Sequence, residues 1–368
     1  MSETNWRHFD FWLLGVVALL TIFGITMIRS AVAGNIELVQ ETNLVQRQLI
    51  FTLIGFPFVF LVASIDYHLW ASISRPMYLI TALALAALTI AGQALYGSAR
   101  WFDTGVILIQ PSEFAKIVVI LTLADFFTRH KEQIGKLSWI VRSFIFTLGI
   151  VIWILLQPNL STSLVIMVIW FALLWASGLK LRHLLLFFLG GLAASFLAFP
   201  FLEDYQQRRI LNFLFPDPQA SYGEQYNIQQ ALIAIGSGGW FGKGYMQGTQ
   251  SQLRFLKVRW SDFIFSVIGE ELGFIGILVM MLLIAFVVLR ILRIARLSRD
   301  TFGALIAYGI ATLIAFQAIV NIGVNLNMLP ATGLTLPFVS YGGSSLLSLL
   351  LGIGLVESVA LRHKSLEF

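Results

Sequence analysis

The chain has 368 residues, of which 58% are apolar and only 12% are charged, with a formal net charge of +5 and no cysteine. This balance is the reverse of that in a water-soluble domain, so we expect a membrane protein, and disulfides, thiolate nucleophiles and cysteine metal sites are excluded. Because 58% of 368 is about 213 apolar residues and a spanning helix needs about 20, up to about ten crossings are possible. The apolar residues run in long blocks rather than alternating, which excludes a β-barrel.

Ten apolar blocks are long enough to predict transmembrane helices. They lie near residues 11–33, 44–65, 76–95, 111–128, 140–156, 159–177, 183–202, 263–289, 303–328 and 338–361. The start of the chain lacks the basic region and cleavage site of a signal peptide, so we expect the first block to be retained. The sequence thus predicts an all-α polytopic membrane protein, a bundle of about ten transmembrane helices that forms one domain over residues 1–368.

Basic residues between the blocks predict the orientation, because short basic loops stay in the cytoplasm. They occupy the joints after blocks four, six and eight and the C-terminal tail: Arg129, Lys131, Lys136, Arg142, Lys180, Arg182, Arg290, Arg293, Arg296, Arg299, Arg362 and Lys364. The joints at 34–43 and 329–337 are acidic or neutral. We therefore expect both termini in the cytoplasm. Since this basic excess reports orientation, we expect no nucleic-acid partner.

One segment, about residues 203–261, is too long for a turn and falls on the outer side between helices seven and eight. It is rich in aromatic and amphipathic pieces, so we expect a folded extracytoplasmic loop rather than disorder. Its cations are Arg208, Arg209, Lys243, Arg254, Lys257 and Arg259. A cationic outer loop suggests an anionic ligand, and attraction to anionic lipid head groups is an equal alternative.

Glu113 and Lys116 lie inside the fourth block, where charged residues are rare and usually functional. Pro111 suits a first helical turn, and the spacing of three places both charges on one helix face. The simpler interpretation is an ion pair that makes the helix end insertable. The functional one is a polar cavity in which Lys116 meets an anion or Glu113 handles a proton.

Asp262 begins the eighth block, with Glu270 and Glu271 about two turns deeper. An aspartate at a helix start is often only a cap. This one stands at the predicted outer membrane edge, beside the cationic loop, where a general base and an anionic substrate can meet. Both roles are compatible.

Two irregular pieces also lie near the outer side. The glycine-rich run 236–244 has Ser237 five residues before Gly242 and glycine after Lys243, so the nucleotide-loop pattern fails, although its backbone amides can still cradle a phosphate. The run 329–345 places two prolines and three glycines at membrane depth. Such backbone is tolerated only where protein or a water-filled cavity satisfies it, so this run is expected to line a cavity.

From the residues alone, two classes of function remain: a transferase acting on a polyprenyl-pyrophosphate sugar, or a carrier that moves such a lipid. A proton-coupled transporter of a small anion is a weaker third. No internal repeat is visible, which counts against transporters built from two similar halves.

Four separated motifs resemble the SEDS family, the shape, elongation, division and sporulation proteins of the bacterial envelope. They are Gln110-Pro111-Ser112-Glu113 with Lys116, residues 234–251, Asp262-Phe263-Ile264-Phe265 with Glu270-Glu271, and residues 337–345. The family's ten helices, large outer loop and cytoplasmic ends agree with the predicted topology. The short N-terminus and Phe255-Leu256 are more similar to the RodA branch than to the FtsW branch.

The resemblance implies a peptidoglycan glycosyltransferase of the bacterial cell membrane that polymerises lipid II during cell-wall elongation and so determines cell shape. It implies a class B penicillin-binding protein as partner, and MreC-like and MreD-like proteins of the elongation complex. Asp262 matches the family's essential aspartate, which implies a general base that deprotonates the acceptor 4-hydroxyl for inverting attack on the donor's anomeric carbon.

The leaving undecaprenyl pyrophosphate develops negative charge that cations must stabilise. The candidates are Arg47, Arg100, Lys116 oriented by Glu113, Arg209 and Lys243. A divalent cation, Mg²⁺ or Mn²⁺, is expected at the pyrophosphate without a legible ligand set, and no organic cofactor is expected.

Two stretches depart from the family. Residues 257–261 read Lys-Val-Arg-Trp-Ser where relatives usually read Pro-Glu, a variable residue, then His-Thr, which bears on how Asp262 is oriented. The common Gln-Pro-Asp-Leu-Gly-Thr appears as residues 157–162 with Asn159, which cannot ionise. A lipid II flippase and a non-catalytic scaffold remain as alternative functions.

Overall fold

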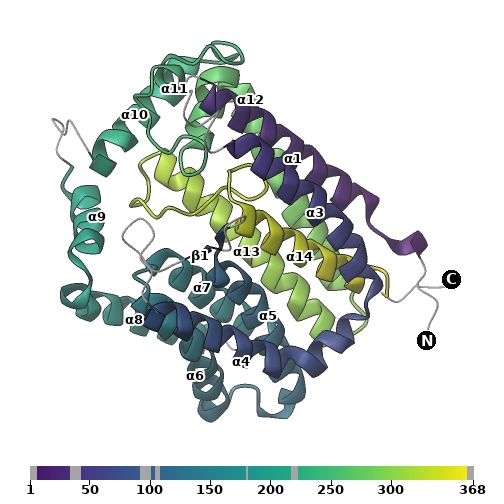
Figure 1. Cartoon of the computed structure of the whole chain (residues 1–368). Helices are drawn as coiled ribbons and strands as arrows, with labels where there is room; N and C mark the ends of the chain where they lie inside the picture. The colour runs from purple at the N-terminus through teal and green to yellow at the C-terminus, as the bar shows by residue number, and fades with distance from the viewer. Residues whose placement is uncertain are drawn as a thin grey trace.

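The computed structural model describes residues 6–33, 43–91, 101–103, 108–179, 181–216 and 223–362. Helices dominate these residues, and Figure 1 shows them packed into one bundle. The helices of the first half are α1 (Phe11–Val32), α3 (Leu44–Ser64), α4 (Tyr67–Ala91), α5 (Pro111–Arg129), α6 (Leu137–Leu156), α7 (Leu160–Ala176) and α8 (Leu181–Ala198). Those of the second half are α9 (Asp204–Leu214), α10 (Gly223–Gly238), α11 (Thr249–Gln252), α12 (Ile264–Leu297), α13 (Thr301–Asn325) and α14 (Gly343–Ala360).

Short elements complete the described chain. They are the 3₁₀ turns η1 (Trp6–His8), η2 (Lys131–Gln133) and η3 (Phe199–Phe201), and the strands β1 (Phe102–Asp103) and β2 (Leu108–Ile109). The two strands pair antiparallel, with Phe102 opposite Ile109. They are a small addition to the predicted all-α fold, immediately before α5.

A long helix lies at each of the ten predicted apolar blocks. Seven helices of the described chain are long and apolar enough to cross a membrane: α1, α3, α4, α6, α12, α13 and α14. In contrast, α7 and α8 offer shorter apolar stretches, and α5 carries Glu113, Lys116, Asp125 and Arg129. The polytopic helical membrane fold is therefore confirmed, while ten crossings and the outer placement of the loop remain predictions.

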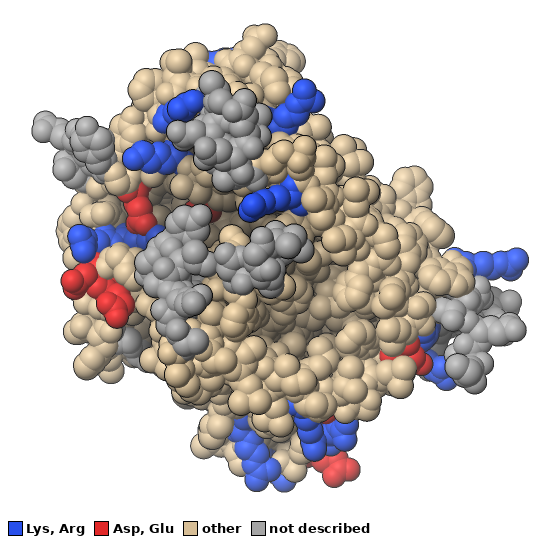
Figure 2. Space-filling view, in the orientation of Figure 1, with Lys and Arg blue, Asp and Glu red and all other residues tan. Residues whose placement is uncertain are grey.

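The centre of the bundle is formed by α13 and α14, whose side chains are mostly buried. The helix α14 packs on α3, α13 and α5, and α12 packs on α13, α10 and α1. On the face shown in Figure 2, charged side chains gather in the upper left part, at the right and at the bottom, and a broad area between these groups carries none. Exposed large apolar side chains such as Leu53, Leu83 and Leu282 belong to spanning helices, where they can face lipid.

The helix α12 is broken at Gly273, where φ is 65° and ψ is −164°. The break frees two carbonyls and two N–H groups that would otherwise bond to each other within the helix. The glycine-rich loop takes all four: Lys243 and Gly244 N–H donate to the carbonyls of Glu270 and Glu271 at 3.0 and 2.9 Å, and Phe274 and Ile275 N–H donate to the carbonyls of Gly239 and Trp240 at 2.8 and 3.1 Å. Because unpaired backbone groups inside a folded protein cost free energy, the loop is what makes the break tolerable.

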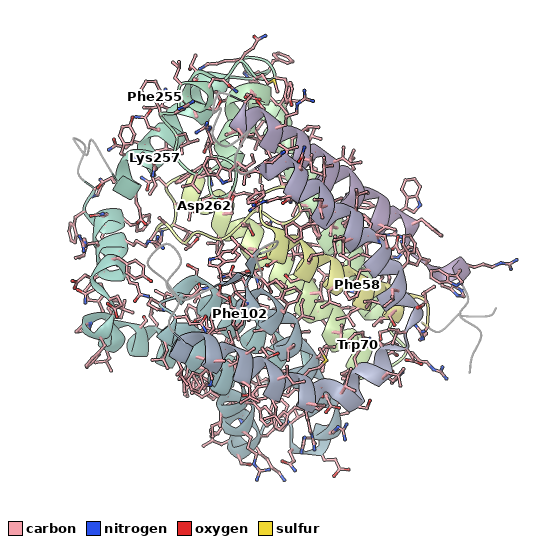
Figure 3. The ribbon with its side chains drawn as sticks, viewed as in Figure 1. Phe58, Trp70, Phe102, Phe255, Lys257 and Asp262 are labelled. Atoms are coloured by element: carbon pink, nitrogen blue, oxygen red, sulfur yellow. The ribbon has the colours of Figure 1, made fainter. Side chains whose placement is uncertain are left out.

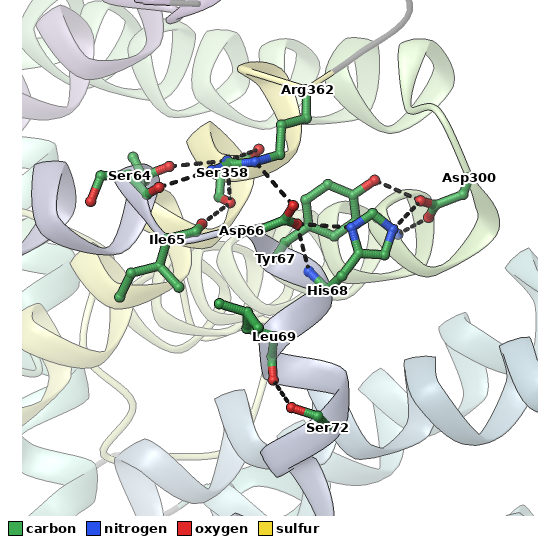
Figure 4. Close-up of polar contacts among 12 residues, drawn as sticks. Ser64, Ile65, Asp66, Tyr67, His68, Leu69, Ser72, Asp300, Ser358 and Arg362 are labelled. Atoms are coloured by element: carbon green, nitrogen blue, oxygen red, sulfur yellow. Dashed lines mark hydrogen bonds and ion pairs between the residues drawn. The ribbon is translucent and has the colours of Figure 1, made fainter. Parts of the chain in front are cut away.

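A polar network holds the end of the bundle opposite to the glycine-rich loop (Figure 4). His68 lies between the carboxylates of Asp66 and Asp300, 2.8 Å from each. The Tyr67 hydroxyl donates to Asp300 at 2.6 Å, and Arg362 donates to the Ser64 carbonyl at 2.9 Å. The network joins the α3–α4 turn, the α12–α13 turn and the end of α14.

We predict that Gly273→Ala destabilises the protein. A Cβ at this position would lie 2.3 Å from the backbone nitrogen of Gly242, in a conformation that L residues rarely adopt. The strain alone costs roughly 1–3 kcal/mol, and the displaced loop adds to it. Thermal unfolding of the purified protein measures the effect. Gly15→Ala, where nothing lies within 4 Å of the added carbon, is the control and should unfold at or above the parent temperature; equal behaviour of both variants contradicts the account.

Candidate active site

Asp262 lies in the turn of residues 258–263, here called the Asp262 turn, immediately before α12. Figure 3 shows it at the end of the bundle remote from Trp70, below the segment that carries Phe255 and Lys257. Its side chain is partly exposed, and the Ser261 hydroxyl donates to its Oδ1 at 2.9 Å. Its Oδ2 lies 3.6 Å from the place that a Cβ of Gly333 would take, so the backbone comes close to the carboxylate here.

Three consecutive backbone carbonyls hold the Asp262 turn in place. The carbonyl of Trp260 accepts a hydrogen bond from Tyr341 N–H at 2.9 Å, and that of Ser261 accepts one from the Ser340 hydroxyl at 2.6 Å. The carbonyl of Asp262 accepts two, from the amides of Asn321 at 3.1 Å and Asn325 at 2.9 Å. The position of Asp262 is therefore set by α13 and by the run 329–345, which the sequence predicted to line a cavity.

Asn321 and Asn325 are functional-site residues that the sequence reasoning missed. They lie one turn apart near the end of α13, and Asn321 also donates to the Leu334 carbonyl at 2.7 Å. The Oδ1 of Asn325 accepts a hydrogen bond from Ser266 at 2.6 Å. Two amides at a spacing of four in an apolar span are the signal that could have found them.

Arg209 of α9 and Glu224 of α10 form an ion pair near Asp262. The Nη2 and Nε of Arg209 lie 2.5 and 2.7 Å from Glu224 Oε1, and the guanidinium lies 5.5 Å from the centre of the Tyr205 ring. A small pocket of about 70 Å³ lies beside the pair, lined also by Gln225, Asn327 and others. The segment 203–261 thus brings one cation and several amides to the same end of the bundle as the carboxylate.

Burial raises the pKa of Asp262 above the ordinary aspartate value of 3.8. The Ser261 hydrogen bond and the charge of Arg209 lower this pKa, and the charge of Glu224 raises it, but the loss of water outweighs them. A carboxylate with a raised pKa is a stronger base when it is ionised.

Glu113 and Lys116 come together as their spacing predicted. The Lys116 Nζ lies 2.8 Å from Glu113 Oε2, and the lysine side chain is fully buried. The Ser348 hydroxyl of α14 lies 3.5 Å from the same oxygen. In this arrangement Lys116 forms an ion pair with Glu113, so its direct contact with a pyrophosphate remains a prediction.

Lys243 is also engaged within the protein. Its Nζ donates to Glu270 Oε1 at 3.0 Å and to the Thr249 hydroxyl at 2.8 Å. Glu270 is fully buried, and the backbone N–H groups of Gln250 and Ser251 also donate to it, at 2.8 and 3.2 Å. Lys243 thus balances a buried carboxylate, and a role at the pyrophosphate remains a prediction.

The remaining two predicted cations are Arg47 and Arg100. Arg47 is exposed near the start of α3. Its neighbour Gln48 is buried and accepts a hydrogen bond from Gly342 N–H at 3.2 Å, which ties this helix to the run 329–345. Arg100 lies outside the described residues.

Both departures from the family motif have a structural account. Asn159 precedes α7, and its Oδ1 accepts a hydrogen bond from Thr162 N–H at 3.2 Å, a cap that needs no charge. Arg259 is buried, and its Nε and Nη1 donate to the carbonyls of Ala31 and Leu256 at 2.5 and 3.3 Å. Arg259 therefore fastens the Asp262 turn to the end of α1.

The expected divalent cation finds little support in the described residues. Among them no three His, Asp or Glu side chains gather as a metal-binding group. The acidic neighbour of Asp262, Glu224, is paired with Arg209. The divalent cation therefore remains a prediction.

A family model described as "Cell cycle protein", of the FtsW, RodA and SpoVE group, matches residues 11–365. The chain belongs to this family. The SEDS resemblance is thereby confirmed, and with it a multi-pass membrane protein.

Curated relatives match over nearly the whole chain. A probable peptidoglycan glycosyltransferase FtsW of Trichlorobacter lovleyi is 36% identical, over 96% of this chain and 93% of the relative. The peptidoglycan glycosyltransferase MrdB of Escherichia coli K12 is 35% identical, over 100% and 98%. The stage V sporulation protein E of Bacillus subtilis is 35% identical, over 95% and 96%.

Solved structures are similar as well. A chain of a peptidoglycan synthase complex has a TM-score of 0.81 and 30% identity, over 96% of this chain and 97% of that chain. The rod shape determining protein RodA of Thermus thermophilus has a TM-score of 0.73 and 30% identity, over 98% and 99%.

We predict that Lys116→Met lowers the stability of the protein. The change leaves the Glu113 carboxylate without its cation in a buried site, which costs roughly 3–5 kcal/mol. The double variant Glu113→Gln, Lys116→Met removes both charges and should recover most of the loss. Thermal unfolding in detergent measures all three proteins. A single variant as stable as the parent would show that water reaches the pair.

Proposed function

We propose that this protein is a peptidoglycan glycosyltransferase that polymerises lipid II, with Asp262 as its general base. One observation carries the proposal: a partly exposed carboxylate, held through its backbone by α13 and the run 329–345, lies where the charge of Arg209 acts on it. Relatives in the same family that carry the name peptidoglycan glycosyltransferase match nearly all of the chain, which supports this activity over a purely structural role.

In the proposed step, Asp262 accepts the proton of the acceptor 4-hydroxyl as that oxygen attacks the anomeric carbon of the donor. A bond forms between the oxygen and the carbon, and the bond from this carbon to the pyrophosphate oxygen breaks. The electron pair leaves with undecaprenyl pyrophosphate, and the configuration inverts because attack comes from the opposite face. Asp262 then returns its proton to water.

Cations must balance the charge that develops on the leaving group. Arg209 is the best placed of the described candidates, since its charge already acts on Asp262 and it lies beside a pocket lined by amides. Lys116 and Lys243 hold buried glutamates, so their help would require rearrangement, and Arg47 and Arg100 complete the proposed set.

The setting proposed for this activity is the bacterial cell membrane, with both termini in the cytoplasm. A class B penicillin-binding protein is the proposed partner, supported by the similarity to a chain of a peptidoglycan synthase complex. We further propose a role in elongation, with MreC-like and MreD-like neighbours; the relatives named FtsW and MrdB match the chain about equally well.

We predict that Asp262→Asn folds normally but abolishes glycan synthesis, because an amide cannot accept the proton. Asp262→Glu should also be poor, since its carboxylate moves by about one bond length. Purified protein, with and without its penicillin-binding partner, is given labelled lipid II, and glycan ladders are read on a gel. Glu132→Gln, at an exposed position in η2, is the control.

Ladders of normal length from Asp262→Asn would overturn the assignment. A flippase would give no ladders from any variant but would move lipid II across vesicles. A scaffold without activity of its own would make Asp262→Asn harmless, so this variant and the parent would behave alike.

We predict that the acid limb of the rate against pH lies above the ordinary aspartate value of 3.8. The base works only when ionised, so the rate falls as the pH drops through its pKa, which burial raises. Removing the charge in Arg209→Gln should raise this pKa further and move the limb to higher pH, whereas Glu224→Gln should move it to lower pH. The pH profile of the polymerisation rate measures both shifts. Shifts of the same sign would exclude Asp262 as the titrating group.

A further inference from the structure

A second pocket, of about 400 Å³, lies at the end of the bundle opposite to Asp262. It is formed by η1, the first turn of α1, the last turns of α12 and Ala360. Beyond the break at Gly273, the 24 residues 274–297 of α12 rise about 36 Å, from the contacts with the glycine-rich loop to Leu297 in the pocket lining. A hydrocarbon core is about 30 Å thick, so this pocket and Asp262 belong to opposite membrane surfaces.

The lining of this pocket is cationic. It contains Arg7, Arg290 and Arg293 and one carboxylate, Asp10. Asp10 has partners within the protein. The Nε and Nη2 of Arg290 lie 2.9 and 2.7 Å from its two oxygens. Its carboxylate also accepts a hydrogen bond from Leu13 N–H at 3.0 Å. Asp10 thus offsets the charge of Arg290, and the charge of Arg293 is the one available to a ligand.

Arg293 is the cation best able to meet a ligand. It lies one turn beyond Arg290 on α12, its side chain is exposed, and within the described chain it makes no ion pair or hydrogen bond. Arg290, by contrast, is held by Asp10 and has only 24% of its side chain exposed.

Apart from His8, the rest of the lining is apolar. Phe11 and Trp12 have 63% and 73% of their surface exposed, and Ile294 and Leu297 form the α12 side. In a spanning protein such exposed rings lie at the level of the lipid head groups, where tryptophan is enriched. A dissolved anion would make use of the arginines only, whereas a phospholipid would use both the charge and the apolar wall.

We propose that this pocket binds the head group of an anionic phospholipid, with Arg293 as the main contact of the phosphate and Trp12 beside the acyl chains. Neutral phospholipids also carry a phosphate, but their head-group cation would meet the positive charge of Arg293. The bound lipid would bridge α1 and α12 and so stabilise their packing. The inference is independent of the proposed enzymatic activity.

The test uses the full-length purified protein in detergent, titrated with phosphatidylglycerol or with phosphatidylcholine of the same acyl chains. Thermal unfolding and native mass spectrometry follow binding. We expect phosphatidylglycerol to raise the unfolding temperature and to remain bound, and phosphatidylcholine to do so much less. Glycerol phosphate, which lacks acyl chains, should have little effect at the same concentrations.

Two arginines of α12 give a matched comparison. Arg293→Gln should weaken phosphatidylglycerol binding about fivefold, the contribution of one basic residue near an anionic surface. Arg296→Gln, at an exposed position on the same helix outside the pocket lining, should leave it nearly unchanged. Arg293→Lys should retain most of the binding because the charge persists.

Three results would overturn the proposal. Equal loss in the Arg293 and Arg296 variants would indicate general surface attraction. Equal binding of the two phospholipids would remove the role of the charge. An effect of glycerol phosphate as large as that of phosphatidylglycerol would show a site for a free anion rather than a lipid.

Discussion

The structure depends on one constraint, that backbone polar groups at membrane depth must find partners inside the protein. The Asp262 turn meets it through the carbonyls of Trp260, Ser261 and Asp262, each of which accepts a hydrogen bond from α13 or from the run 329–345. The break in α12 meets it through the glycine-rich loop. In both places the irregular backbone persists because a distant segment completes its hydrogen bonds, and in both the result is a carboxylate held in a fixed position.

Buried charged side chains likewise have partners inside the protein. Glu113 is paired with Lys116, and Glu270 is surrounded by Lys243, Thr249 and two backbone N–H groups. Glu271 has the Ser30 hydroxyl 2.6 Å from one of its oxygens. These partners offset the cost of removing charge from water, so the groups can be structural. Asp262 differs, because its side chain keeps some exposure and receives one hydrogen bond from Ser261. That difference supports treating it as the chemical group of the set.

The two ends of the bundle are built differently. At the Asp262 end, helices give way to turns and short helices that bring Arg209, Glu224 and several amides together. At the other end, the ion pair of Arg290 with Asp10 and the contacts of His68 with Asp66 and Asp300 join successive turns. The first arrangement leaves room for a ligand, whereas the second mainly fastens helices, apart from the pocket beside Arg293.

The sequence by itself determined the helical membrane class, the positions of the long helices and the pairing of Glu113 with Lys116. These follow from local properties, namely the length of apolar blocks and the spacing of residues on one helix. The motif around Asp262 also made this residue the candidate general base. Only the tertiary structure decided that Lys243 belongs to Glu270, that the glycine-rich loop completes the break in α12, and that Asn321 and Asn325 hold the Asp262 turn. Those contacts join residues that are far apart in the chain or depend on how a loop folds back, and no local pattern specifies which distant group will satisfy a buried one.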